Sequence, residues 1–203
     1  MRIYLRTVRN VPVICMLSPV MLRTQFTKLV TFGITICVSF VSLAAQELLY
    51  PVITGYAGVA RVSVDTTVID STATQRVVAE LVSPAIKPDA PHQYLVMVAR
   101  WVNLFAVSGV PRNRVDIVVV IHGEAAYALL NNDAHRARYG YDNPNTELIQ
   151  KISAAGVTLL FCGQTLAIRQ IAKESIAPQC KVVLGMATAV IPLQLRGYAY
   201  VKL

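Results

Sequence analysis

One cysteine of the chain lies in a setting that favours thiol chemistry. Cys162 follows the apolar run Val157 to Phe161, which predicts a short buried strand, and a helix is expected to begin two or three residues later. The positive end of that helix stabilises a thiolate, which is the nucleophilic form of cysteine. Cys162 is therefore the first candidate for a catalytic residue. The alternative interpretation is a small hydrophobic residue buried at a strand end.

A second cysteine, Cys180, precedes the predicted strand Lys181 to Leu184. If that strand runs parallel to the one ending at Cys162, the two thiols lie at opposite ends of the sheet, on the order of 15 Å apart at ~3.3 Å per residue. A disulfide needs Cα atoms within about 7 Å, so the sequence disfavours a bridge. With no helix start expected nearby, Cys180 is predicted to keep the ordinary pKa of a free thiol.

The histidines suggest support for a thiol rather than a metal site. His122 ends the predicted strand that begins at Val115, and Gly123 follows it, at the sheet edge expected for Cys162. An imidazole there can support the thiolate, or its hydrogen bonds are satisfied by loop backbone, and the sequence does not choose. His92, His122 and His135 lack metal-ligand spacing, so no metal is predicted. Because no glycine-rich nucleotide or phosphate loop is present, no cofactor is predicted.

The segment Asn131 to Asn145 is predicted to be a long polar loop. Loops of this length in compact domains often bind ligands, and Arg136 and Arg138 could pair there with an anionic ligand or a sulfur anion. The alternative is an ordinary solvated loop.

Strands and helices alternate along most of the chain, which predicts an α/β fold with a mostly parallel sheet and helices on both faces. Residues 46–74 read as an extended arm, and residues 75–203 as one domain. The predicted strands are 76–82, 115–122, 157–161, 181–184 and 198–201, and the predicted helices are 94–105, 124–130, 144–155, 166–175 and 187–195.

The N-terminal region, residues 1–45, is predicted to be a signal peptide with its leader. The first 44 residues hold five of the 19 basic residues and none of the 11 acidic ones, so the rest is nearly neutral and nucleic acid is not an expected partner. The uncharged run Leu29 to Ala44 ends in a small-residue pattern that favours cleavage after Ala44 or Ala45 and export to the periplasm. The alternative is a membrane anchor over residues 29–46. Met1, Met16 and Met21 remain alternative starts.

Five short segments follow one another along the chain: Trp101-Val102-Asn103-Leu104, His122-Gly123, Asn143-Pro144-Asn145, Cys162-Gly163-Gln164-Thr165 and Gln194-Leu195-Arg196-Gly197-Tyr198. Their order and spacing resemble the DsrE/DsrF-like (YchN-like) sulfur-relay family. The resemblance covers about residues 75–203 and implies a flavodoxin-like three-layer sandwich that forms trimers or hexamers. It also implies that Cys162 carries sulfur as a persulfide, with His122, Gly123, Asn145, Gly163 and Gln164 as binding candidates beside Arg136 and Arg138.

The sequence therefore supports the hypothesis of an exported sulfur carrier. Cys162 would attack a sulfane sulfur donor, hold the sulfur as a persulfide and pass it to an acceptor thiol, with backbone N–H groups of residues 163–166 stabilising the anion.

Expected partners are further copies of the chain, in a homotrimer or homohexamer, together with a sulfur donor and an acceptor, but not a membrane once the leader is cleaved. Apolar helices such as Tyr94 to Phe105 also favour self-association. The alternatives are a non-catalytic oligomeric binding or assembly protein and a thiol redox sensor. The export signal and the absence of a basic tail depart from the cytoplasmic relay members.

Overall fold

The computed structural model describes residues 47–65 and 67–203. The predicted leader over residues 1–45 and the alternative anchor over residues 29–46 both lie outside this part of the chain. Among the helices that are described, none is both long enough and apolar enough to cross a membrane.

Five parallel strands form the central sheet, in the order β6-β5-β4-β3-β7. A chain that places helices between parallel strands brings all the carboxyl ends of the strands to one edge. The prediction of an α/β fold with a parallel sheet is confirmed. The strands are β3 (Gln75–Leu81), β4 (Val115–Ile121), β5 (Thr158–Cys162), β6 (Cys180–Val183) and β7 (Ala199–Lys202).

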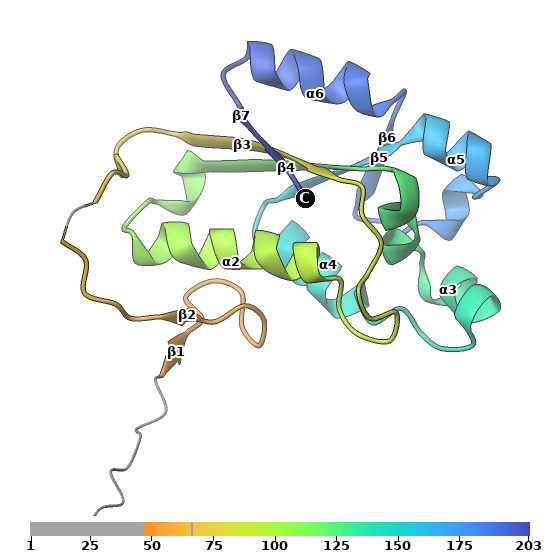
Figure 1. Ribbon diagram of the computed structural model, residues 1–203, viewed down its shortest axis with the longest axis horizontal. Helices are drawn as coiled ribbons and strands as arrows, with labels where there is room; N and C mark the ends of the chain where they lie inside the picture. Colours follow the sequence, from red (N-terminus) through yellow and green to blue (C-terminus); the bar gives the residue numbers. More distant parts are fainter. Residues whose placement is uncertain (1–46, 66) are drawn as a thin grey trace, which may run out of the picture. The chain divides into compact units, whose positions relative to one another are not determined.

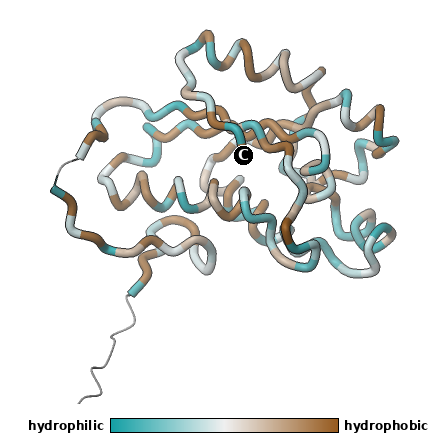
Figure 2. Tube along the Cα trace, viewed as in Figure 1, coloured by the Kyte–Doolittle hydropathy of each residue, from teal (hydrophilic) through white to brown (hydrophobic). Residues whose placement is uncertain are grey.

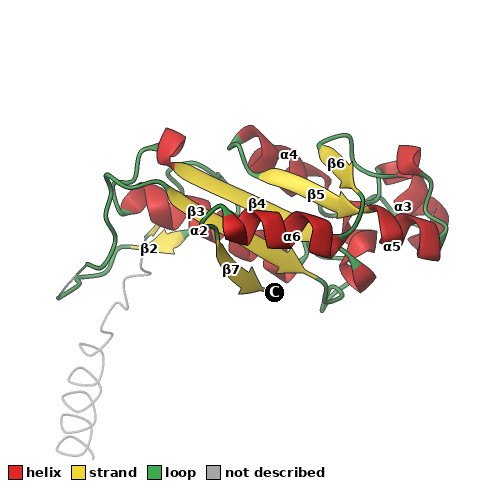
Figure 3. Cartoon of the chain, turned by 90° about the horizontal axis from the view of Figure 1, so that it is seen from above, coloured by secondary structure: helices red, strands yellow, loops and turns green. Residues whose placement is uncertain are grey.

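Helices cover the two faces of this sheet unequally. Figure 1 shows α2 (Gln93–Val107) and α4 (Thr146–Ala154) on one face, while α6 (Met186–Leu195) lies on the other. The view from above shows α6 crossing the sheet on its way from β6, at one edge, to β7, at the other (Figure 3). The result is a three-layer sandwich in which α6 is the one described helix that covers the second face.

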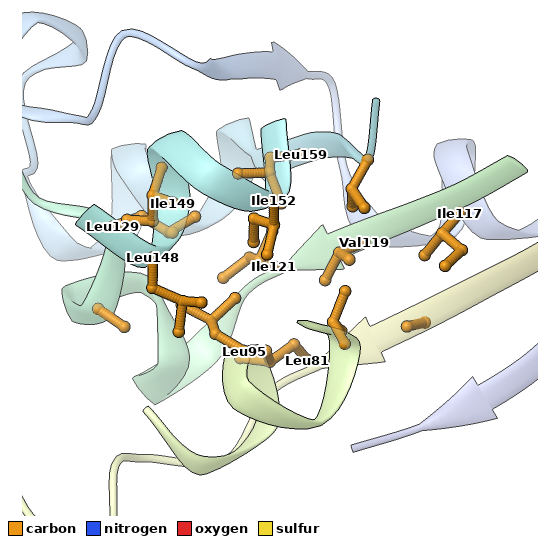
Figure 4. Close-up of a cluster of buried hydrophobic side chains, with 14 of the residues drawn as sticks. Leu81, Leu95, Ile117, Val119, Ile121, Leu129, Leu148, Ile149, Ile152 and Leu159 are labelled. Atoms are coloured by element: carbon orange, nitrogen blue, oxygen red, sulfur yellow. The ribbon is translucent and has the colours of Figure 1, made fainter. Parts of the chain in front are cut away.

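The hydrophobic core follows this asymmetry. Ile117, Val119 and Ile121 of β4 belong to the large cluster on the α2 and α4 face (Figure 4), whereas Val118 and Val120 belong to a small cluster under α6. Successive side chains of a strand point to opposite faces, so a strand buried on both faces is apolar throughout. The hydropathy colouring shows the brown strands enclosed between the helical layers (Figure 2).

The prediction of a polar loop over residues 131–145 is wrong, because it contains the helix α3 (Asn132–Tyr139). The Asn131 side chain caps the start of α3 by accepting a hydrogen bond from the Ala134 N–H at 2.9 Å. Gly140, with φ of 86°, ends the helix in the left-handed conformation that glycine adopts without strain. Both capping signals are present in the sequence, but the scarcity of apolar residues hides the helix.

The remaining elements are short. The helix predicted over residues 166–175 is wrong in its bounds, since α5 (Gly163–Arg169) begins directly after Cys162 and ends where Gln170 turns left-handed at φ 54°. The others are β1 (Leu48–Leu49), β2 (Val59–Ala60) and the 3₁₀ helices η1 (Arg112–Arg114), η2 (Gly123–Leu129) and η3 (Lys173–Ser175).

The segment before β3 is held on the domain by one buried amide. The Oδ1 atom of Asn103, in α2, accepts hydrogen bonds from the backbone N–H groups of Val52 at 3.1 Å and Ile53 at 2.9 Å. Its Nδ2 group donates to the carbonyl of Ile53 at 3.2 Å and to two further carbonyls. Ile53 then packs in the main core. A single side chain thus satisfies several backbone groups that burial would otherwise leave without partners.

We expect Asn103→Ala to lower the free energy of unfolding by about 2–4 kcal/mol, since each buried polar group left without a partner costs ~1–3 kcal/mol. Chemical denaturation followed by circular dichroism measures the change. The control is Leu104→Ala, the exposed neighbour on the same helix, which should cost less than about 1 kcal/mol. Equal losses in the two variants would contradict the anchoring role of Asn103.

Candidate functional site

Cys162 lies where the starts of two helices converge. It is the last residue of β5 and the residue that precedes α5, and only 4% of it is exposed. The backbone N–H groups of Thr165 and Gln164 in α5, and of Met186, the first residue of α6, lower the pKa of its thiol as hydrogen-bond donors. The Thr165 hydroxyl acts on the thiol in the same direction.

These hydrogen bonds change the acidity of the thiol. Burial by itself raises the pKa of Cys162, because it penalises the charged form. The donors from Thr165, Met186 and Gln164 favour the thiolate and outweigh burial, so the pKa of Cys162 lies below the ordinary value of a cysteine. The site therefore stabilises the nucleophilic form of the thiol.

Glycine at position 163 allows the second helix to approach. A Cβ atom on Gly163 would lie 2.8 Å from the carbonyl oxygen of Val183 and 3.3 Å from that of Leu184, which is too close for any larger residue without a shift of the backbone. The Gln164 side chain donates a hydrogen bond to the Leu184 carbonyl at 3.2 Å. Both predicted binding residues thus hold the segment that leads to α6 next to Cys162.

His122 belongs to a polar cluster on the α6 face of the sheet. Its Nε2 atom lies 2.8 Å from Oε1 of Glu80, and the hydroxyl of Tyr200 donates a hydrogen bond to the other carboxylate oxygen. Glu80 is 6% exposed and lies in the middle of the sheet, on β3. The ring of His122 therefore bonds to a carboxylate and not to loop backbone.

Glu80 is ionised despite its burial. Burial raises the pKa of this carboxyl group, but the hydrogen bonds from Tyr200 and His122 outweigh it, with the charges of His122 and Lys202 acting in the same direction. The pKa of Glu80 is therefore below its ordinary value. The sequence did not single out Glu80, because it lies within an otherwise apolar predicted strand.

A hydrogen bond connects the two halves of the site. The backbone N–H of Gly123 donates to Oγ1 of Thr165 at 3.3 Å, and the same Thr165 hydroxyl helps to lower the pKa of Cys162. Gly123 has φ of 62°, a conformation that glycine adopts readily. The end of β4 and the first turn of α5 are thus joined through Thr165, a second residue that the sequence did not single out for its side chain.

Asn145 is held away from Cys162. Its Oδ1 atom accepts a hydrogen bond from the His92 N–H at 2.6 Å, and its Nδ2 group donates to Oδ1 of Asn143 at 2.9 Å. Asn145 is buried, and these bonds tie the start of α2 to the start of α4. A binding role of Asn145 stays a prediction.

Arg136 and Arg138 are also engaged elsewhere. Arg136 forms ion pairs with Asp133 at 2.7 Å and Asp142 at 2.6 Å. The Arg138 guanidinium stacks 3.8 Å from the centre of the Tyr127 ring. In the described part of the chain, none of the interactions of Cys162 involves either arginine.

The prediction that Cys180 keeps an ordinary thiol pKa is wrong. Cys180 is paired with Leu159, at the opposite end of β5 from Cys162, and burial raises the pKa of its thiol to about 12. Both cysteines are free thiols. The Cys162 thiol is therefore more acidic than an ordinary cysteine, whereas the Cys180 thiol is less acidic.

A cavity of about 140 Å³ lies near the carboxyl edge but does not include Cys162. Within the described residues, no group of three or more histidine, cysteine or acidic side chains is arranged to hold a metal ion. The residues that line the cavity include His92, Tyr127, His135, Tyr139 and Asn145.

Residues 85–203 match the sequence profile of the DsrE/DsrF-like family, which is more than half of the chain. The chain belongs to the DsrE/DsrF-like family. No curated protein matches this DsrE/DsrF-like chain. A similar solved structure is that of MTH1491, a protein of unknown function from Methanobacterium thermoautotrophicum, with 19% identity and a TM-score of 0.49 over 64% of this chain and 99% of that chain.

We expect a limiting amount of iodoacetamide at pH 7 to modify Cys162 of this DsrE/DsrF-like protein before Cys180. The hydrogen bonds to Cys162 favour its thiolate, while the raised pKa of Cys180 leaves almost none of its reactive form. Peptide mass mapping over time measures both sites. The prediction fails if Cys180 is modified first, or if the Cys162→Ser protein reacts as quickly as the unchanged protein.

Proposed function

We propose that this DsrE/DsrF-like protein carries sulfane sulfur on Cys162. The family has a sulfur-relay-type fold. The observation that supports this chemistry most strongly is the set of hydrogen bonds to the Cys162 sulfur from two helix starts and the Thr165 hydroxyl. The same donors would stabilise a persulfide anion on Cys162, because its negative charge lies close to the position of the thiolate sulfur.

The proposed transfer has two steps. The Cys162 thiolate attacks the outer sulfur of a donor persulfide, R–S–SH, forming the new S–S bond of Cys162–S–SH as the donor S–S bond breaks and R–S⁻ leaves. An acceptor thiolate then attacks the outer sulfur of Cys162–S–SH, and the thiolate of Cys162 is regenerated. Sulfur moves at constant oxidation state, so neither step needs an oxidant or a reductant.

Incubation with inorganic polysulfide tests the proposal, because a compact donor can reach a thiol that is only 4% exposed. We expect peptide mass spectrometry to show one added sulfur atom on the Cys162 peptide, in the unchanged protein and in Cys180→Ser but not in Cys162→Ser. Addition of free cysteine should remove this sulfur and yield cysteine persulfide.

Two other outcomes would overturn sulfur transfer. A Cys162 that gains no sulfur supports the non-catalytic binding or assembly protein. A Cys162 that gains sulfur but forms a stable mixed disulfide with the acceptor, without releasing a persulfide, supports the thiol redox sensor.

We also propose that the protein acts as a homo-oligomer, as a trimer or hexamer. The outward side of α6 is apolar, with Ile191 exposed and Leu195 84% exposed, and Leu184 lies exposed just before the helix. Several large apolar side chains exposed on and next to one helix are typical of a protein interface.

We expect light scattering at micromolar concentration to give a mass well above that of one chain. Ile191→Asp with Leu195→Asp should lower the mass to that of one chain, because a buried charge without a partner disfavours the interface. The matched control is Ile86→Asp, an exposed apolar residue in the loop before α2. A single-chain mass for the unchanged protein rules out self-association.

A further inference from the structure

We propose that Glu80 is a positioning residue that fixes His122 as the proton carrier for sulfur transfer at Cys162. This inference rests on the proposed function. It gives roles to Glu80 and His122, which lie far from Cys162 in the sequence. It also assigns a role to the buried carboxylate of Glu80, which is not among the donors to Cys162.

The parallel register places His122 beside Cys162. Ile121 of β4 pairs with Phe161 of β5, so the next residues of the two strands, His122 and Cys162, are neighbours across a gap of about 4.8 Å between strands. Val120 belongs to the cluster under α6, and alternation puts His122 on the same face. Cys162 faces that side as well, because Leu160, two residues before it on β5, packs against the same cluster.

Glu80 determines which nitrogen of His122 carries the proton in the neutral ring. Its ionised carboxylate can only accept, so the 2.8 Å contact requires Nε2–H of His122 as the donor. The lone pair of a neutral imidazole then lies on Nδ1, which has no hydrogen-bond partner among the described residues. The His122 side chain is 19% exposed, so Nδ1 remains available to a proton from the site.

The second carboxylate oxygen is fixed as well. The Tyr200 hydroxyl donates a hydrogen bond to this oxygen, which prevents the carboxylate from turning away from His122. The carboxylate also stabilises the imidazolium that forms when Nδ1 takes up a proton. Glu80 therefore acts through His122 and does not touch the sulfur.

The proton balance of the transfer follows from this arrangement. The Cys162 thiol gives its proton to water, Nδ1 of His122 takes up a proton from water, and the thiolate attacks the outer sulfur of R–S–SH. The imidazolium then gives that proton to the departing R–S⁻. The overall change is Cys162–SH plus R–S–SH to Cys162–S–SH plus R–SH, with no proton gained or lost by the protein.

Few other charged groups can replace this pair. The helix α6, which covers this face, has no ionisable side chain over its length. The carboxylate of Asp116 bonds to Tyr198 near the amino ends of the strands, far along β4 from His122. The titratable and charged groups that face His122 from the neighbouring strands are Glu80 of β3, Tyr200 and Lys202 of β7, and Cys162 of β5.

The test compares two donors of similar size, ethanethiol persulfide and trifluoroethanethiol persulfide. The fluorines make the second leaving thiolate a weaker base, which departs readily without a proton. We expect Glu80→Gln and His122→Gln to slow transfer from the ethanethiol donor by about 10²-fold, the lower end for general acid catalysis, and to slow transfer from the fluorinated donor less than about fivefold. The double variant should be no slower than His122→Gln alone.

Alkylation by iodoacetamide separates positioning from loss of structure. Iodide leaves without a proton, so we expect Glu80→Gln to keep the alkylation rate of Cys162 within about threefold, since the donors to its sulfur remain. Equal slowing of alkylation and of both transfers would show a structural role and overturn the inference. Transfer at unchanged rates from both donors would overturn it too. If Glu80→Gln does not fold, His122→Gln and Tyr200→Phe support the same comparison.

The matched control is Asp116→Asn, which removes a carboxylate with a tyrosine partner on the same sheet face and should leave both transfer rates unchanged. The two proposals fail in different ways. An unchanged protein that takes sulfur from neither donor overturns the proposed function. A protein that takes sulfur without dependence on Glu80 overturns only the present inference.

Discussion

The parallel register of β3, β4 and β5 is the constraint on which the site depends. Residues that follow paired positions in neighbouring strands meet at the carboxyl edge, and alternation decides which face they share. Glu80, His122 and Cys162 come from three strands, yet they lie on the single face that α6 covers. A shift of one residue in either pairing would move one of these side chains to the face that holds the main core.

Opposing effects act on the Cys162 thiol. Burial disfavours the thiolate, whereas donors from α5 and α6 favour it, and the donors prevail. Cys180 shows what burial does alone, because it raises the pKa of that thiol to about 12. The difference between the two cysteines comes from the donors around Cys162, with Thr165 of α5 the largest contributor and Met186, at the start of α6, a further one.

Much of the fold and part of the site follow from sequence patterns. Alternating strands and helices predict the parallel sheet, and a cysteine and a histidine at strand ends predict their shared edge. Glu80 and Tyr200 could not be found in this way, because their pairing depends on β7 returning to lie beside β3. Local sequence also does not show the ion pair of Arg136 or the ring contact of Arg138, because both depend on side chains that the fold brings together around α3.

The most direct measurement is a pH titration of the thiolate absorbance of Cys162 in the Cys180→Ser protein. The account predicts a pKa below the ordinary value of a cysteine, and a higher pKa in Thr165→Val than in Thr165→Ser, because only the valine removes the hydroxyl donor. A Cys162 pKa at or above the ordinary value would contradict the claim that hydrogen bonds outweigh burial at this thiol.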